Sequence, residues 1–435
     1  MPPNEFKQRR KRLMRAMPKG SVAILASAAP SIRNRDVEYP YRQDSDFFYL
    51  TGFNECDSIV VLAPGRKQGE YVVFCREHDE KLAVWVGRNA GLEGARDVYG
   101  ADEALPVAEL HKHLPGLIEN HERVYYAIGR DDDLDHRVMT AVNAVRARAR
   151  TGVRAPYEFV AIEHLLHELR LVKSPAEIKA MRRAAEVSAA AHKRAMQACR
   201  PGRFEYEIEA ELVHEFTRHG LRAQAYPCIV AGGKNACVLH YTDNGDALAD
   251  GDLLLIDAGA EHENYAADIT RTFPVNGSFS EAQRALYELV LDAQLAAIKQ
   301  VKPGKRWNEP HDTAVRVLTK GLVALGLLEG RVGKLIKDEA YKKFYMHRTG
   351  HWLGMDVHDV GDYRTDDDWR PLEPGMVLTV EPGLYIPADC TDVDPRWRGI
   401  GIRIEDDVLV TEKGHEVLTA AAPKSVAEIE AFMRS

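Results

Sequence analysis

The sequence predicts two domains: an α/β domain over residues 1–170, and an α+β domain over residues 171–435 that is built from two similar halves. Three observations lead to this prediction. Short apolar runs alternate with helical stretches in the first part, a strongly capped helix begins near residue 174, and a pattern of two helices followed by strands then occurs twice. With 435 residues, 45% of them hydrophobic, the chain is long enough for two or three domains.

The first domain is expected to hold its core around short buried strands. A helix over residues 6–17, with its basic residues on a solvated face, precedes them. The segment YRQDSDFFYLTG, residues 41–52, is interpreted as a polar stretch that leads into an aromatic strand. The apolar runs that predict the other strands are residues 22–25, 58–62, 71–74 and 124–128.

The second domain begins with a clear helix start. Ser174 is an N-cap residue, Pro175 occupies the first helical position, and Glu177 completes a capping box. This helix stops at a Pro-Gly pair, and a second helix follows over about residues 204–218. About one hundred residues later Ser280 and Gln283 form another capping box, followed by the same helix, Pro-Gly and helix order. The repeat predicts two halves related by a pseudo-twofold axis, with a ligand site between them.

Composition narrows the class of protein. The net charge of −8 and the lack of a recurring basic stripe argue against nucleic acid as a partner. No run of 18 apolar residues predicts a membrane span, and the apolar stretch near residue 22 is shorter than a secretion signal requires. The six cysteines form no C-x-x-C pair or regular framework, so we expect reduced thiols and a cytoplasmic location.

Five ionisable residues stand in short, mostly apolar segments of the second domain. They are Asp257, Asp268, His351, Glu381 and Glu405. A carboxylate that closes a run such as LLLID is rarely buried unless it is paired or binds a metal. Four carboxylates brought together repel one another, so a positive charge is expected between them. Four carboxylates with one imidazole suit a pair of divalent ions.

The spacing of the acids supports their convergence. If residues 253–257 and 265–273 are two arms of a hairpin, Asp257 and Asp268 face each other across it, at the separation of about 4.5–5.5 Å usual for cross-strand partners. The same arithmetic places Glu381 opposite Glu405, with the polar segment 388–395 as the connection. Such pairs suit two metal ions about 3.5–4 Å apart.

Several motifs carry a resemblance to a known family. They are HRTGHWLGMDVHD (347–359), IDAG (256–259) with DITRTFP (268–274), EPGMVLTVEPG (373–383) and GIGIRIEDD (399–407). Together they resemble the pita-bread metallopeptidases, which include aminopeptidase P, prolidase and methionine aminopeptidase. RQDSDFFYLTGFNE (42–55) is similar to the creatinase-like N-terminal domain of bacterial aminopeptidase P. One departure is Arg348, where the family often has a small residue.

The resemblance implies a dinuclear metal site. It makes Asp257 a ligand of one ion, Asp268 and Glu405 bridges between both ions, and His351 and Glu381 ligands of the other. Mn²⁺ is the family's usual metal, with Co²⁺ or Zn²⁺ as alternatives. The implied nucleophile is a hydroxide shared by the ions, and Glu381 is the implied proton shuttle.

Further residues are implied to line the substrate pocket. His240 and His358 are expected to donate hydrogen bonds to the carbonyl oxygen as it gains charge. His347 is either a substrate contact or a support behind the pocket. Arg403 either neutralises the carboxylates or contacts substrate, and Tyr385 is either a pocket residue or an ordinary packed tyrosine.

The implied function is an aminopeptidase that removes the N-terminal residue from peptides with proline at position two. An Xaa-Pro bond has no N–H, so peptidases that need this donor fail on it. The alternatives are a prolidase restricted to Xaa-Pro dipeptides and a non-enzymatic pita-bread module that binds peptides or histones. The resemblance also implies a homodimer or homotetramer. Trp85 either caps the proline pocket, possibly of another subunit, or packs within its own strand.

Overall fold

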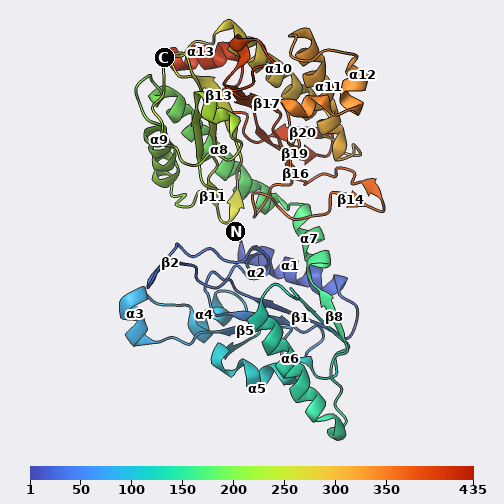
Figure 1. The fold of residues 1–435 in the computed structure, drawn as a ribbon. Coiled ribbons are helices and arrows are strands. Elements are labelled where there is room, and N and C mark those ends of the chain that lie inside the picture. Colours follow the sequence, from blue (N-terminus) through green and yellow to red (C-terminus); the bar gives the residue numbers. More distant parts are fainter. The chain divides into compact units, whose positions relative to one another are not determined.

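The computed structural model describes all 435 residues, which divide into two compact units, Met1–Arg170 and Leu171–Ser435. Both units can be followed by colour in Figure 1. No helix in either unit combines the length and the apolar composition that a bilayer crossing requires. The fold of each unit is described separately below.

The first unit contains a six-stranded mixed sheet, with one short strand pair outside it. Its strands are β1 (Ser21–Ala26), β4 (Ile59–Leu62), β5 (Tyr71–Cys75), β6 (Glu103–Pro106), β7 (Arg123–Tyr126) and β8 (Glu158–Ala161), and the outside pair is β2 (Ile32–Asn34) and β3 (Val37–Glu38). The order in the sheet is β6-β5-β4-β1-β7-β8. The pairs β1–β7, β7–β8 and β5–β6 are parallel, whereas β4 is antiparallel to both of its neighbours. The four apolar runs of the sequence therefore form β1, β4, β5 and β7, as predicted.

Seven helices and two short 3₁₀ turns accompany this sheet. They are α1 (Pro3–Ala16), α2 (Ser45–Thr51), α3 (Glu80–Val86), α4 (Gly91–Asp97), α5 (Leu110–Ile118), α6 (Asp132–Ala147) and α7 (Glu163–Leu171), with turns at Val107–Glu109 and Ala149–Thr151. Apolar residues of α5 and α6, such as Leu114 and Val142, pack with Val22 and Ile24 of β1 in one buried cluster. The burial of these side chains is the main driving force for the unit's fold.

Two predictions for this unit are wrong. The aromatic run within residues 41–52 forms helix α2, because the Asp44 side chain accepts a hydrogen bond from the Phe47 N–H and Gly52 ends the helix with a φ of 66°. In α1, Arg9 and Arg10 are buried instead of solvated. Their guanidinium groups stack on tyrosine rings and donate hydrogen bonds to backbone oxygens of α2.

The second unit begins with the first of its two halves. Helix α8 (Pro175–Ala198) starts with the predicted Ser174–Glu177 capping box, and it packs against α9 (Glu205–Arg218). Strand β10 (Leu253–Asp257) lies between β9 (Ile229–Gly232) and β13 (Thr270–Pro274), antiparallel to both. The remaining elements are the 3₁₀ turn Gly233–Cys237 and the short hairpin of β11 (Glu261–His262) and β12 (Tyr265–Ala266).

The second half repeats this arrangement. Helix α10 (Glu281–Ile298) begins with the predicted Ser280–Gln283 box and packs against α11 (Asn308–Ala324). In Figure 1, α9 and α11 lie on opposite sides of the strands of this unit. The other elements of this half are α12 (Val332–Lys337), β14 (Arg364–Thr365), β15 (Asp368–Trp369), β16 (Val377–Val380), β17 (Gly383–Ile386), β18 (Ile400–Arg403), β19 (Asp406–Thr411), β20 (Gly414–Val417) and α13 (Val426–Arg434), with turns at Ala340–Lys343 and Pro395–Trp397.

One large apolar core joins the halves. It includes Leu254 of β10, Val290 of α10, Leu318 of α11 and Val408 of β19, all completely or almost completely buried. The strands β16, β19 and β20 form one antiparallel sheet, and β17 pairs with β18. The ends of strands from both halves meet, and four of the five ionisable residues noted above, the acids, lie at or next to these ends, whereas His351 lies in an irregular segment.

Candidate metal centre

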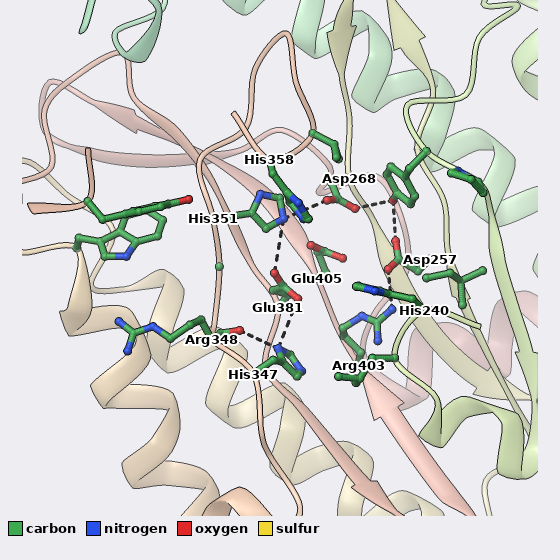
Figure 2. A pocket seen from close by; sticks show the side chains of 18 of the residues that line it. His240, Asp257, Asp268, His347, Arg348, His351, His358, Glu381, Arg403 and Glu405 are labelled. Atoms are coloured by element: carbon green, nitrogen blue, oxygen red, sulfur yellow. Dashed lines mark hydrogen bonds and ion pairs between the residues drawn. The ribbon is translucent and has the colours of Figure 1, made fainter. Parts of the chain in front are cut away.

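The five predicted metal ligands converge on one cavity of 1090 Å³ in the second unit. Figure 2 shows their side chains pointing toward a common centre. Ligand atoms of Asp268, His351 and Glu405 lie within 4.8 Å of one another, a spacing suited to a metal ion. Asp257 and Glu381 line the same cavity. The structure thus brings together all five side chains, which are up to 148 positions apart in the sequence.

The hairpin that carries Asp257 and Asp268 differs from the predicted register. Asp257 pairs with Thr270, two residues beyond Asp268. The turn is centred on Glu263 and Asn264, which both adopt positive φ as a two-residue hairpin turn requires, one position later than predicted. The two aspartates are diagonal neighbours on one face of the hairpin. Between them the backbone approaches closely at Gly259, where a Cβ would lie 1.7 Å from the Ala267 oxygen.

The second acid-bearing hairpin has the predicted register. Val380 pairs with Asp406 in one sheet, and Gly383 pairs with Arg403 in the next. A single register runs through both sheets, so Glu381 and Glu405 stand opposite each other where the strands pass from one sheet to the other. The break in pairing at this position turns both carboxylates toward the cavity.

His351 is oriented by its own backbone surroundings. Its Nδ1 lies 2.9 Å from the Trp352 oxygen, which fixes the proton on that nitrogen. Its Nε2 is therefore directed at the carboxylates, 3.3 Å from Asp268 and 3.6 Å from Glu381. The preceding Gly350 has no room for a side chain, since a Cβ there would lie 2.0 Å from the Thr379 oxygen. In its neutral form, the imidazole would present the Nε2 lone pair to the centre of the site.

The carboxylates are close enough to perturb one another. Burial, together with the charges of Asp268 and other acids, raises the pKa of Glu405 well above its usual range. Burial also raises the pKa of Glu381 to about 7. For Asp268, burial acts in the same direction, but the hydrogen bond and charge of His351 outweigh it and hold the pKa below its usual value. Burial lowers the affinity of His351 for a proton, yet Asp268 and Glu381 raise its pKa to about 9.

The donor set fits divalent cations. Four carboxylates face one permanent cation, Arg403, whose Nη2 lies 2.6 Å from Asp257. The Tyr226 hydroxyl lies 2.6 Å from Asp257 and 2.5 Å from Asp268. A phenol has one proton, so only one of these short contacts is an ordinary hydrogen bond. A positive charge between the two aspartates would offset the repulsion at the other short contact. Oxygen-rich ligands with one imidazole suit ions such as Mn²⁺.

A second, fully paired layer lies directly behind the cavity. Buried Arg271 donates hydrogen bonds to the backbone carbonyl oxygen of Glu405 at 2.5 Å and to the Asp406 carboxylate at 2.7 Å. Asp406 also accepts from Lys424 at 2.6 Å. Burial acts to raise the pKa of Asp406, but these two cations hold it well below its usual range. Arg271 further donates to the backbone oxygens of residues 422 and 423.

The predicted pocket residues lie around the metal ligands. His240 and His358 line the cavity, and the His358 ring stands edge-on to His351 with centroids 4.4 Å apart. His347 also lines the cavity, and its Nε2 lies 2.9 Å from the Tyr385 hydroxyl. Burial lowers the pKa of His347 to about 3, so this imidazole is neutral at physiological pH.

Arg403 and Tyr385 form a buried chain of hydrogen bonds behind these side chains. The Tyr385 hydroxyl accepts a hydrogen bond from Arg403 Nη1 at 3.1 Å, and Arg403 Nε donates to Thr270 at 3.0 Å. Tyr385 is thus linked by polar contacts to both His347 and Arg403, in addition to being packed. Arg403 is the counter-charge of Asp257 and also lines the cavity.

Trp85 lies in the first unit and is not packed in a strand. It belongs to helix α3, and 85% of its surface is exposed. Its neighbours Val84 and Val86 are exposed as well. The interpretation of Trp85 as a residue buried in its own strand is therefore wrong.

Three residues of the site were missed in the sequence. Tyr226 contacts both aspartates, but a single tyrosine before a proline carries no pattern that reveals this. Asp407 accepts the Asp268 N–H through its carboxylate, and it stands in the acidic run after Ile404. Arg271 lies in the DITRTFP segment. The last two belong to recognised motifs, so their positions beside the ligands were the available signal.

Comparisons with known proteins agree with this geometry. Residues 179–412 match the model of metallopeptidase family M24, and residues 6–125 match that of the aminopeptidase P N-terminal domain. The chain is 47% identical to the Xaa-Pro aminopeptidase of Escherichia coli K12, over 99% of this chain and 97% of that relative.

Solved structures give the same result. An aminopeptidase of Pseudomonas aeruginosa matches with a TM-score of 0.99 and 59% identity, over 100% of this chain and 98% of that one. A zinc-substituted E. coli aminopeptidase P in complex with product matches with a TM-score of 0.97 and 47% identity, over the same shares. These matches confirm the predicted fold class, a creatinase-like α/β domain followed by a pita-bread domain. The chain belongs to metallopeptidase family M24, with an N-terminal domain of the aminopeptidase P type.

Proposed function

We propose that this protein is a dinuclear metal-dependent aminopeptidase that hydrolyses the bond between an N-terminal residue and proline. The observation that carries the proposal is the convergence of Asp257, Asp268, His351, Glu381 and Glu405 in one cavity. The proline preference is supported by the name of the E. coli relative, a Xaa-Pro aminopeptidase that matches over nearly the whole chain. The proposed domains are residues 1–170 and the catalytic residues 171–435.

The five residues would hold two divalent ions, of which Mn²⁺ is proposed and Co²⁺ and Zn²⁺ are alternatives. In this proposal Asp268 and Glu405 bridge the ions, Asp257 binds one, and His351 and Glu381 bind the other. When bound, such a pair lowers the pKa of a water molecule and polarises the scissile carbonyl. The remaining steps fall to side chains of the chain itself.

Glu381 is proposed to move the proton. Its carboxylate accepts a proton from the attacking water and passes it to the proline nitrogen as the bond breaks. A carboxylate beside the scissile bond is able to take up and release a proton in this way. Its Oε2 faces His347 Nδ1 at 3.7 Å, and its N–H is fixed by the Thr349 oxygen at 2.8 Å.

The cavity histidines are proposed to bind the substrate carbonyl. His240 and His358 would donate hydrogen bonds to its oxygen as negative charge develops there. Arg403, Tyr385 and His347 form the hydrogen-bonded relay that starts at Asp257, so we propose that they hold this wall of the pocket in place. The neutral state of His347 leaves it able to take part in this relay without adding charge.

A prolidase restricted to dipeptides is the second candidate. The cavity of 1090 Å³ is at the upper end of the range of about 300–1,000 Å³ usual for small-molecule pockets, so it has room for more than a dipeptide. This size and the name of the relative favour the aminopeptidase. A non-enzymatic peptide- or histone-binding module is disfavoured, because the complete set of five ligands is present.

The test compares substrate length in one assay. Release of the first residue is measured with an Xaa-Pro dipeptide, an Xaa-Pro-Xaa tripeptide and a longer Xaa-Pro peptide, after chelation and again after addition of Mn²⁺, Co²⁺ or Zn²⁺. We expect metal-dependent cleavage of the tripeptide and the longer peptide. Cleavage of the dipeptide alone would establish prolidase activity, and no cleavage with any metal would refute the proposal. The matched control is Asp268→Asn, which removes a negative charge while keeping the shape of the side chain.

A homodimer or homotetramer in the cytoplasm is also proposed. Trp85 is exposed on α3, as a residue that closes the proline pocket of another subunit must be. Its planar indole suits a pyrrolidine ring, which offers apolar surface and no donor. Sedimentation of the purified protein and fractionation of cells would test the assembly and the location.

A further inference from the structure

One wall of the cavity is cationic and aromatic. Arg348 and Arg364 both line the cavity, and so does Trp369. The two guanidinium groups lie over the Trp369 ring, 5.1 Å and 4.4 Å from its centroid. Distances of this size allow cation–π contacts, which hold long arginine side chains in place. In Figure 2 the Arg348 guanidinium extends away from the metal ligands His351 and Glu381.

Neither of these guanidinium groups has a carboxylate partner. A nearby arginine provides the contrast, because Arg306 forms an ion pair with Asp368 at 3.0 Å beside the same tryptophan. The one acid that shares the cavity wall with Arg348 and Arg364 is Asp362, and no ion pair joins it to either of them. Asp366 and Asp367 stand in the adjacent β14–β15 turn but do not line the cavity, so the lining of this end has two arginines and one aspartate. An anionic group is the complementary ligand.

The direction of the peptide follows from the chemistry. An aminopeptidase accommodates a single residue before the scissile bond, and that residue carries a positive α-amino group. This amino group is attracted by the carboxylates and repelled by Arg348 and Arg364. A part of the cavity that extends beyond the centre must then hold the peptide that follows proline.

We propose that Arg348 and Arg364, held against Trp369, form a subsite for a carboxylate on the part of the substrate that follows proline. This inference rests on the proposed aminopeptidase function and names its preferred substrates. The carboxylate has two possible sources, an Asp or Glu side chain at position three or four, or the free C-terminus of a short peptide. The subsite thus selects peptides by charge, whereas the metal centre acts on the bond before proline.

Three pairs of substrates separate these sources. Ala-Pro-Glu-amide is compared with Ala-Pro-Gln-amide, and Ala-Pro-Ala-Glu-amide with Ala-Pro-Ala-Gln-amide. Ala-Pro-Ala with a free C-terminus is compared with its amide. The readout is the ratio of kcat/KM within each pair, for the wild type and for the double variant Arg348→Gln, Arg364→Gln. Because each pair shares its metal chemistry and its scissile bond, the ratio reports only on the added charge.

We expect at least one pair to favour the carboxylate by about three- to tenfold in the wild type, as partly exposed ion pairs allow. The ratio should fall to about one in the double variant and should shrink as salt is added. The matched control is Arg306→Gln, which removes an arginine already paired with Asp368 and should keep the wild-type ratio. A ratio near one for all wild-type pairs, or an unchanged ratio in the double variant, overturns the subsite.

The outcome also separates this inference from the proposed function. If Ala-Pro-Ala-amide is cleaved but no pair shows a charge preference, the subsite is wrong and the aminopeptidase stands. If no peptide is cleaved at any metal concentration, the aminopeptidase proposal fails, and the substrate subsite fails with it. Preference for the free C-terminus alone assigns the subsite to short peptides, and preference for Glu over Gln assigns it to acidic side chains.

Discussion

Glu405 and Asp406 are adjacent, equally buried acids that meet opposite electrostatic surroundings. Glu405 faces the cavity among other carboxylates, and burial with these like charges raises its pKa. Asp406 lies behind the cavity in the inner layer, which consists of Arg271, Asp406 and Lys424. The two cations outweigh the effect of burial and lower the pKa of Asp406. The inner layer contains its own counter-charges and is complete as folded. The cavity has one arginine, Arg403, for four carboxylates, so we expect it to take up cations from solution.

Removal of a carboxylate that is proposed to bind both ions should have the strongest effect on activity. Asp268→Ala or Glu405→Ala should abolish peptidase activity and lose bound metal, because each of these carboxylates is proposed to bridge both ions. Metal content is measured by elemental analysis after gel filtration, together with activity on an Xaa-Pro peptide. Retention of two ions by Asp268→Ala would sink the bridging assignment.

Two variants compare how much Asp406 and Glu405 each contribute to the free energy of unfolding. In the metal-free protein, Asp406→Asn should reduce the free energy of unfolding by about 3–5 kcal/mol, because it leaves buried Arg271 without its charged partner. Glu405→Gln should change it by less than about 1 kcal/mol, since the amide keeps the shape of the side chain and removes a charge that burial and the neighbouring acids disfavour. Urea unfolding followed by circular dichroism measures both. Equal losses in the two variants would show that the layers do not differ.

Variants of two cavity histidines test which residues bind substrate without binding metal. His240→Ala and His358→Ala should keep metal and fold, since neither side chain belongs to the proposed ligand set. Each should lower kcat by roughly 10²–10³-fold, the loss expected for one hydrogen-bond donor to a developing oxyanion. Steady-state kinetics with metal analysis tests this. An unchanged kcat in both variants would leave them as structural residues.

A pH series on the metal-free protein isolates Glu381. Its pKa is about 7 in the folded state and near 4.5 in the unfolded chain, so folding favours the protonated form. The stabilisation is full below pH 4.5 and is lost as the pH rises through 7, by up to about 3 kcal/mol. Comparing the wild type with Glu381→Gln at each pH removes the contributions of other groups. A difference that stays constant from pH 4.5 to 8 would contradict the assignment.

A weaker effect is expected from Trp85, which is proposed to close the substrate pocket of another subunit. Trp85→Ala should raise KM for short Xaa-Pro substrates by about two- to tenfold, the range of one aromatic contact, while metal content and fold stay unchanged. Unfolding of this variant is not expected, because Trp85 is 85% exposed. Unaltered kinetics would refute the capping role.

The convergence of the five proposed metal ligands was accessible from sequence, because a charged residue after a buried apolar run is costly and therefore conspicuous. The register of Glu381 and Glu405 followed from symmetry about their connection. For Asp257 and Asp268, a turn centred one residue later moved the pairing by two positions.

Other features depended on tertiary contacts that no local pattern reports. The helix before Gly52 is an exception, because the Asp44 cap that starts it is a local signal, which the interpretation as a strand overlooked. Arg9 is buried because Tyr49 and its backbone oxygen receive the guanidinium group. Tyr226 is a single residue whose position is set by two distant aspartates. Such pairings depend on the assembled fold, and one sequence does not contain them in readable form.

The contacts of Arg271 have a consequence for the order of events during synthesis. This side chain joins the Glu405 backbone to the backbone of residues 422 and 423, which follow Arg271 by 151 and 152 positions in the chain. The 166 residues from Asp257 to residue 423 take roughly 8 to 33 seconds to synthesise at about 5–20 residues per second, so the partners that complete the centre are made later than Asp257. The nascent chain is therefore unable to assemble an active centre until the segment that contains residues 405–423 has been made.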